Sequence, residues 1–382
     1  MQLKRYPWRI AVFLMVYYMT NALFQGYLSL YYVDCGFSSA QIGMIFAFVA
    51  LISIASQPFW GLRSDRARSR RRVIEGLALA SAALSASFLF SRQYAALLAL
   101  AGAFSFFYTS LQPLGDAAVL SALGDRPFGP ARLAGGMAYA VVSLLYGMSM
   151  AKTGSSRLSV ILIAAFCLLM IPAAHWIPDS PGAQSDGKRR MPFARLIQNR
   201  ELMRLMLFLL PMQMTMGYFY TFFSPQFLAL SGANGAKLGL SYFIAAASEI
   251  PYLLLSDRLL ERFGAGKLMC ASGAFLTARW LILAQTQSAA VAMLSQLLHG
   301  GGFIVMSVSM AKHIQNTVPA ELKSSGQMLL AMASYGFARA VGNLLGGTLA
   351  NAFGRQNVFF LSAGICALAL AIFAPGMLKK AS

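Results

Sequence analysis

The stretch AQIGMIFAFVALISIASQPFWGLRSDRARSRRR, residues 40–72, joins two very different kinds of sequence. Its first 23 residues, 40–62, contain no charged side chain, and residues 63–72 contain six arginines. An apolar run of about 20 residues is long enough to cross the roughly 30 Å hydrocarbon core of a membrane as a helix. Arginine and lysine collect on the cytoplasmic side of such helices. We therefore predict a transmembrane helix that ends at a cytoplasmic basic loop.

Similar apolar runs recur along the whole chain. Of its 382 residues, 58% are hydrophobic and 11% are charged, whereas soluble domains have about 45–50% apolar and about 25% charged residues. This composition excludes an ordinary soluble enzyme, and the content of apolar and aromatic residues excludes disorder. We predict twelve membrane spans, at 10–32, 40–62, 73–91, 95–123, 132–151, 157–177, 203–230, 237–256, 267–286, 288–311, 324–350 and 356–376.

These spans predict an all-α integral membrane protein. In lipid, backbone polar groups must be paired inside a helix or a closed barrel, and a barrel would need short alternating strands. The polar linker 178–202 separates an N-terminal six-helix bundle, 1–177, from a C-terminal one, 203–382. The tripeptide Ser-Asp-Arg follows the second span of each half, at 64–66 and 256–258. This repetition is typical of transporters built from parallel repeats.

The basic residues predict the orientation of the chain. Outside the spans, 24 lysines and arginines fall on the side of both termini and the central linker, and five fall on the other side. We therefore expect both termini in the cytoplasm of a multi-pass plasma membrane protein, most simply of a bacterial inner membrane. The net charge of +19 is explained by this topology, so we expect no nucleic-acid partner.

The six-plus-six pattern and the loop after span two resemble the major facilitator superfamily. Its loop motif, Gly-x-x-x-Asp-Arg-x-Gly-Arg-Arg, corresponds here to Gly61-Leu-Arg-Ser-Asp65-Arg66-Ala-Arg68-Ser-Arg70-Arg71, with Arg68 in place of a glycine. The resemblance implies two bundles of six helices and transport by alternating access. It also implies that Asp65, Arg66, Asp257 and Arg258 form a cytoplasmic gate.

A closer resemblance is to the lactose permease and phenylpropionate permease branch, which contains proton symporters. It is carried by Ala278-Arg279-Trp280, Leu298-His299-Gly300, Pro113-Leu-Gly-Asp116 and Phe128-Gly-Pro-Ala-Arg132. In that branch, the corresponding glutamate, arginine and histidine of the second half take part in proton coupling. The acid that usually follows the histidine by one turn is replaced here by Gly302.

Charged groups inside apolar spans are costly and normally face a partner or a cavity. At about 1.5 Å per residue, Glu249 lies roughly 12 Å, Arg279 roughly 18 Å and His299 roughly 20 Å above the cytoplasmic ends of their helices. The three side chains can therefore meet in one layer. We predict an ion pair between Glu249 and Arg279 that His299 joins, which serves either as a proton relay or as a static lock between helices.

The substrate-binding candidates come from both halves. Asp116 and Arg132 lie on consecutive helices that we expect to be neighbours, so a salt bridge is feasible, and Tyr139 lies on the same face as Arg132. The resemblance gives these three residues a role in binding sugar, whereas Arg132 can also be an ordinary membrane anchor. Arg339 is a candidate anion-binding residue or a structural arginine. The remaining candidates are polar or aromatic side chains of spans one and seven, namely Asn21, Gln25 and Tyr218.

The most economical function is proton-coupled uptake of a small organic solute, with the proton as coupling ion and no other cofactor or metal. We expect a monomer in contact with membrane lipid. Proton-driven efflux of drugs or metabolites is the alternative, although span one has no acid and span five has no proline. A receptor or scaffold would give no reason for charged groups within the spans. A membrane enzyme is the least expected class, because the sequence shows no nucleophile–base pair or metal cluster, and we expect no enzymatic activity.

Overall fold

The computed structural model describes residues 6–181, 196–319 and 322–378. The predicted linker, 178–202, falls largely on residues 182–195, outside this description. The helices before the linker are α1 (Trp8–Gly26), α2 (Leu28–Asp34), α3 (Ser39–Asp65), α4 (Arg70–Ser87), η2 (Phe88–Phe90), α5 (Tyr94–Tyr108), α6 (Leu111–Leu123), α7 (Gly129–Thr153) and α8 (Arg157–Ala174). Those after it are α10 (Arg200–Leu228), α11 (Gly235–Gln285), α12 (Ala289–Leu294), η3 (Ser295–Leu298), η4 (Gly300–Ile304), α13 (Val305–Thr317), α14 (Lys323–Ala331), η6 (Met332–Ala338), α15 (Arg339–Phe353) and α16 (Arg355–Leu378).

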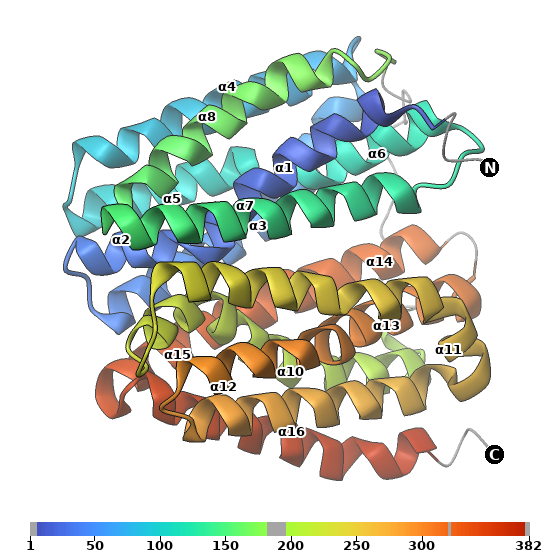
Figure 1. The fold of residues 1–382 in the computed structure, drawn as a ribbon. Helices are drawn as coiled ribbons and strands as arrows, with labels where there is room; N and C mark the ends of the chain where they lie inside the picture. Colours follow the sequence, from blue (N-terminus) through green and yellow to red (C-terminus); the bar gives the residue numbers. More distant parts are fainter. Residues whose placement is uncertain (1–5, 182–195, 320–321, 379–382) are drawn as a thin grey trace. The chain divides into compact units, whose positions relative to one another are not determined.

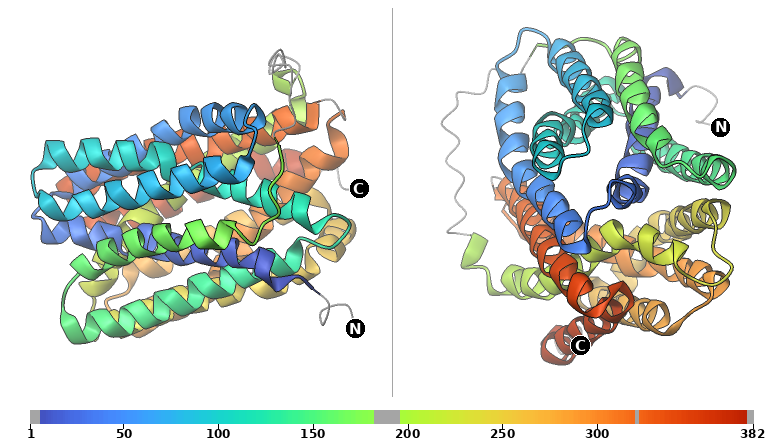
Figure 2. Two further views of the ribbon diagram at one scale, coloured as in Figure 1. Left: turned by 90° about the horizontal axis from the view of Figure 1, so that it is seen from above. Right: turned by 90° about the vertical axis from the view of Figure 1, so that its left-hand side faces the viewer.

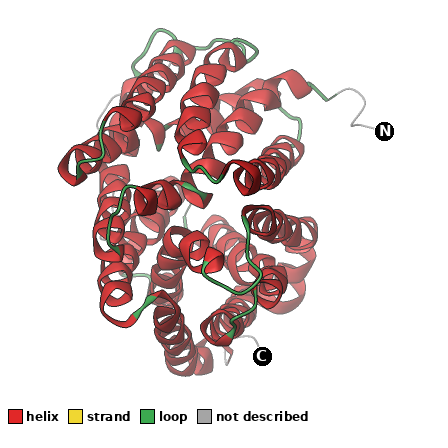
Figure 3. Ribbon diagram, turned by 60° about the vertical axis from the view of Figure 1, so that its left-hand side comes forward, coloured by secondary structure: helices red, strands yellow, loops and turns green. Residues whose placement is uncertain are grey.

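The described residues form a helical protein with short loops (Figure 3). Ten of the described helices are long and apolar enough to cross a membrane, against twelve predicted runs. The 51-residue α11 contains two of these runs, 237–256 and 267–286, joined at Gly264, whose φ of 74° interrupts the helical backbone. The first predicted run, 10–32, is divided at Tyr27 into α1 and α2, and neither piece is among the ten. The all-α class is confirmed.

The chain divides into two compact units (Figure 2). The first comprises residues 1–37 and 48–189, and the second comprises 38–47 and 190–382, as far as these residues are described. In the first unit α1 packs against α6, α7 and α8, while α4 packs against α5 and α8 (Figure 1). The core is strongly aromatic, with Tyr17 stacked on Tyr108 at 5.3 Å between ring centroids.

The second unit is organised around α11 and α10. The two parts of α11 contact α16, η3, η4 and α13, while α10 contacts α15, α16 and η6. Glycines allow these helices to approach closely. A Cβ atom on Gly217 of α10 would lie 2.9 Å from the Cα atom of Arg339, and one on Gly342 of α15 would overlap the carbonyl oxygen of Met214. Small residues at such crossings are how apolar helices pack tightly in a membrane.

Candidate functional site

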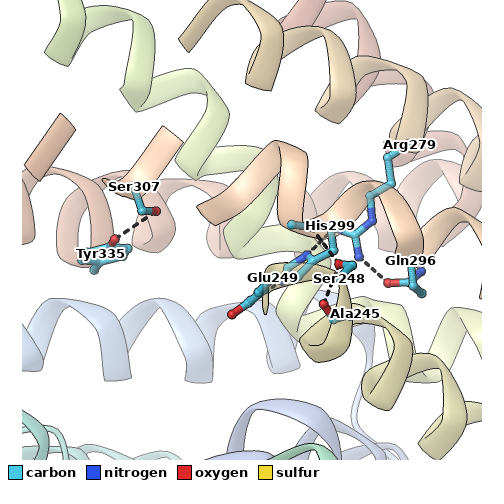
Figure 4. Close-up of polar contacts among 9 residues, drawn as sticks. Ala245, Ser248, Glu249, Arg279, Gln296, His299, Ser307 and Tyr335 are labelled. Carbon is cyan, nitrogen blue, oxygen red and sulfur yellow. Dashed lines mark hydrogen bonds and ion pairs between the residues drawn. The ribbon is translucent and has the colours of Figure 1, made fainter. Parts of the chain in front are cut away.

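A buried polar chain runs through the second unit (Figure 4). Glu249 lies on the first part of α11 and Arg279 on the second part, while His299 lies between η3 and η4. The Oε1 atom of Glu249 is 3.2 Å from Nε2 of His299. The Nδ1 atom of His299 is 2.8 Å from Nη1 of Arg279. The Nη2 atom of Arg279 donates a further hydrogen bond to Oε1 of Gln296.

The exposed fraction of these side chains increases from Arg279 through His299 to Glu249. Arg279 is 0% exposed and His299 is 4% exposed, whereas 25% of the Glu249 side chain is exposed. The Arg279 guanidinium also lies 4.0 Å from the ring centroid of Phe219 and 5.1 Å from that of Trp280. These aromatic faces favour a cation. The chain therefore leads from a fully enclosed positive charge to a carboxylate that reaches the surface of the unit.

The donors and acceptors fix the proton on His299. Arginine is a donor only, so Nδ1 of His299 must accept the hydrogen bond from Arg279. The imidazole proton then lies on Nε2 and is donated to Oε1 of Glu249. His299 is neutral in this arrangement, because a second proton on Nδ1 would face the N–H group of Arg279.

The predicted direct ion pair between Glu249 and Arg279 is wrong. His299 lies between the two charged groups and contacts both. The prediction placed the three residues at a similar depth along their helices, which the contacts bear out. It did not include Gln296, which is 0% exposed and holds the other side of the Arg279 guanidinium. The position of Gln296 one helical turn before His299 is the only signal for it in the sequence.

A glycine run places His299 against α11. The backbone N–H of Gly300 donates to Oγ of Ser248, the residue before Glu249, at 2.9 Å. A Cβ atom on Gly300 would overlap the Ser248 carbonyl oxygen, so only glycine permits this crossing. At Gly302, one turn after His299, a Cβ atom would lie 2.8 Å from Cδ2 of Leu276. An acidic side chain at Gly302 would therefore require the Leu276 side chain to move.

Arg339 lies near this chain, at the junction of η6 and α15. Its Nε donates to Oε1 of Gln213 at 3.4 Å. The guanidinium carbon lies 4.9 Å from the ring centroid of Tyr220, 4.8 Å from that of Tyr335 and 5.9 Å from that of Phe303. Tyr220 and Phe303 also contact the His299 ring, at centroid distances of 6.3 and 5.5 Å. Arg339 and His299 therefore share two aromatic neighbours.

Of the two tyrosines Tyr218 and Tyr220 of α10, it is Tyr220 that lies beside His299 and Arg339. Tyr218 is 2% exposed and its hydroxyl donates to the carbonyl of Arg355 at 2.6 Å. Its ring stacks on Phe222 at 4.9 Å between centroids. Tyr218 therefore packs α10 against its neighbours. Tyr220, two residues later and on another face of the helix, lies beside His299 and Arg339.

In the first unit, Arg132 and Gln112 both contact Tyr18. The guanidinium carbon of Arg132 lies 4.3 Å from the Tyr18 ring centroid, and Nε2 of Gln112 donates to the Tyr18 hydroxyl at 2.9 Å. Asp116 is one turn after Gln112 on α6, and its Oδ1 atom is buried without a hydrogen-bond partner among the described residues. The salt bridge between Asp116 and Arg132 stays a prediction.

The other first-unit candidates lie on α1 and α7. Gln25 donates from Nε2 to Oδ1 of Asn21 at 3.0 Å, so the two amides of α1 pair with each other. Asn21 is buried and Gln25 is half-buried. Tyr139 is half-buried on α7, the helix that carries Arg132.

Of the four predicted gate residues, Asp65 ends α3 and Arg66 follows it, whereas Asp257 and Arg258 lie within α11, before its break at Gly264. Asp65 accepts a hydrogen bond from Nη2 of Arg70 at 3.0 Å, and Asp257 pairs with Nζ of Lys312. Each acid therefore pairs with a neighbouring helix of its own unit, while Arg66 and Arg258 are exposed. Nearby, the Ser69 hydroxyl holds the pKa of Asp179 below its usual value.

Comparison with known proteins supports a transporter. The family model described as "MFS_1 like family" matches residues 7–361. The chain is 23% identical over 347 residues to the uncharacterized transporter YwbF of Bacillus subtilis (strain 168), covering 87% of this chain and 83% of that protein. It is 25% identical over 376 residues to the maltose permease of Geobacillus stearothermophilus, covering 93% and 90% of the two chains.

The fold matches those of solved transporters. The nucleoside transporter NupG superposes with a TM-score of 0.84 at 15% identity, over 98% of this chain and 99% of that one. A bacterial homologue of the human lysosomal transporter Spinster, inward-facing and unoccupied, gives a TM-score of 0.76 at 12% identity, over 98% and 97% of the chains. The chain therefore belongs to the MFS_1 like family and is an integral membrane transporter, not an enzyme.

Proposed function

We propose that this protein is a proton-coupled symporter that takes up a small organic solute by alternating access between its two halves. The proposal places it near the lactose permease and phenylpropionate permease branch, in a plasma membrane with both termini in the cytoplasm. The observation that carries it is the chain from Glu249 through His299 to Arg279. Both hydrogen bonds of His299 in this series depend on which imidazole nitrogen is protonated.

The chain has two proton states that differ in their contacts. With Arg279 donating to Nδ1, His299 holds one proton and cannot take a second. A second proton fits on His299 only when Arg279 leaves Nδ1, and the partly exposed Glu249 is the group through which such a proton would pass. The π-helical turn η4 begins directly after His299, and such turns often mark functional sites. Proton binding and the position of Arg279 are thus coupled.

Glu249 is the acid best suited to carry the transported proton. A coupling group must change its charge during the cycle, which arginine cannot do at physiological pH. Among the described acids of the second unit, Glu249 is the one that contacts the His299–Arg279 pair. The relatives indicate candidate solutes, since they include a maltose permease and a nucleoside transporter.

The test uses purified protein in vesicles with an imposed pH gradient. Radiolabelled maltose, nucleosides and organic carboxylates are offered to the wild type, to Glu249→Gln and to Glu261→Gln. Glu261 is an exposed glutamate on the same helix and serves as the matched control. We expect the wild type and the control to accumulate a solute when the outside is acidic. Glu249→Gln should exchange that solute across the membrane without accumulating it, and pH-driven accumulation by Glu249→Gln would refute the role of Glu249.

A further inference from the structure

Arg339 is a positive charge without an acidic partner among the described residues. The described ion pairs, taken at distances up to 4.0 Å, do not include Arg339, and its polar contact is the neutral amide of Gln213. A charged group within a membrane span is costly and marks a functional site when nothing neutralises it. The surrounding aromatic rings soften that cost through cation–π contacts but supply no negative charge.

The positive and negative charges of Glu249, Arg279, His299 and Arg339, together called the second-unit cluster, do not balance. Glu249 contributes one negative charge, while Arg279 and Arg339 contribute two positive charges, and His299 is neutral in the observed arrangement. The described cluster therefore has one positive charge in excess. A ligand with a single negative charge would neutralise it, whereas a phosphate monoester, with nearly two negative charges at neutral pH, would leave an excess negative charge.

The position of Arg339 also suits a ligand. Gln213 is 1% exposed and fixes the Nε edge of the guanidinium, which leaves the Nη atoms as donors. Tyr220, Phe303 and Tyr335 surround the guanidinium, and Tyr335 is 38% exposed. A planar guanidinium held in this way matches the two oxygens of a carboxylate. Apolar parts of the same ligand can lie on the aromatic rings.

We propose that the transported solute is an organic monoanion whose carboxylate binds Arg339, beside the proton-carrying chain. This inference rests on the proposed function, because it assumes that the second-unit cluster is the transport site. Tyr220 and Phe303, which contact both Arg339 and His299, form the wall shared by the anion site and the proton chain.

The experiment measures binding rather than transport, with the full-length protein in lipid nanodiscs at constant ionic strength. The probes are glucuronate, glucose and glucose 6-phosphate, which share a sugar ring but differ in charge, together with benzoate and benzamide. Binding is followed by thermal shift and by tryptophan fluorescence, since Trp280 lies next to Arg279. The variants are Arg339→Gln, Arg339→Lys and the control Arg262→Gln, an exposed arginine that also lies over an aromatic ring.

We expect a carboxylate to bind more tightly than its neutral counterpart and than the phosphate ester. Arg339→Gln should weaken carboxylate binding about 10- to 100-fold, the range for a lost charge-assisted hydrogen bond. Arg339→Lys should lose less, and Arg262→Gln should bind as the wild type does. Without ligand, Arg339→Gln should melt at the wild-type temperature or above, because it removes an uncompensated charge.

Several outcomes would overturn the proposal. These are the absence of carboxylate-selective binding in the panel, tighter binding of glucose 6-phosphate, or unchanged carboxylate binding in Arg339→Gln. A large fall in the melting temperature of ligand-free Arg339→Gln would assign the arginine a structural role instead. Failure of the proposed function looks different: carboxylates would bind through Arg339, but a pH gradient would not drive their accumulation.

Discussion

Replacing Gly300 with alanine tests whether a close helix crossing holds the proton chain together. The added methyl group would overlap the carbonyl oxygen of Ser248 and lie 2.9 Å from Cδ2 of Tyr252. The Tyr252 ring can rotate, but a backbone oxygen of α11 cannot move without its helix. The segment that carries His299 must therefore shift away from the part of α11 that carries Glu249.

The expected magnitude follows from two opposing effects. Forcing an extra methyl group into a packed crossing costs about 1–3 kcal/mol, while replacing a helical glycine with alanine returns about 0.5–1 kcal/mol. The difference of the two ranges makes Gly300→Ala less stable by up to about 2.5 kcal/mol. Transport should suffer more, because a shift of about 1 Å would lengthen the 3.2 Å contact between Glu249 and His299 beyond hydrogen-bonding range.

The assay compares Gly300→Ala with Gly364→Ala. Gly364 lies on α16, where an added Cβ atom meets nothing within 4 Å, so its replacement should leave the melting temperature unchanged or raise it. Thermal unfolding and pH-driven uptake are measured for both variants in the same lipid. Wild-type stability and uptake in Gly300→Ala would refute the steric reasoning. Equal destabilisation by both replacements would show a general intolerance of alanine instead of a specific crossing.

Two further predictions concern the first unit and the topology. Asp116→Asn and Arg132→Gln should each weaken substrate binding about tenfold without reducing the yield of folded protein, and normal binding in both variants would make these residues membrane anchors. Reporter fusions after Arg72, near Asp186 and at Ser382 should all give a cytoplasmic signal, although the last two sites lie outside the described residues. A periplasmic signal at Asp186 would exclude the six-plus-six arrangement.

Much of the fold could be predicted because membrane spans depend on length and apolarity alone. The run 40–62 lies within α3 and the run 356–376 within α16. The positions at which helices are interrupted are harder to predict from the sequence. The polar residues between the runs 237–256 and 267–286 indicated a loop, yet the helix continues to Gly264 and resumes immediately after it. The π-helical turns η4 and η6 left no periodic signal, since each adds a residue to a helix without changing its composition.

The sequence predicts which residues form the candidate site, but not which of them contact one another. Counting residues gives the depth of Glu249, Arg279 and His299 along their helices. The direction in which each side chain points depends on how the helices are rotated against one another. At the crossing beside His299, Gly300 contacts Ser248 too closely for a larger residue. For the same reason, the sequence does not distinguish Tyr218, which packs in the core, from Tyr220, which lies beside Arg339.

The place of His299 between the two charges changes what the cluster can do. A direct pair of Glu249 and Arg279 would hold the carboxylate ionised for as long as it lasted. With the imidazole between them, Arg279 instead determines which nitrogen of His299 has the proton, and Glu249 receives the hydrogen bond from the other nitrogen. A proton that reaches Glu249 removes the charge facing Nε2, and a proton on Nδ1 requires Arg279 to leave. In the proposed mechanism, displacement of the buried Arg279 guanidinium from Nδ1 would therefore distinguish the two proton states. Gln296 is the other hydrogen-bond partner of that guanidinium.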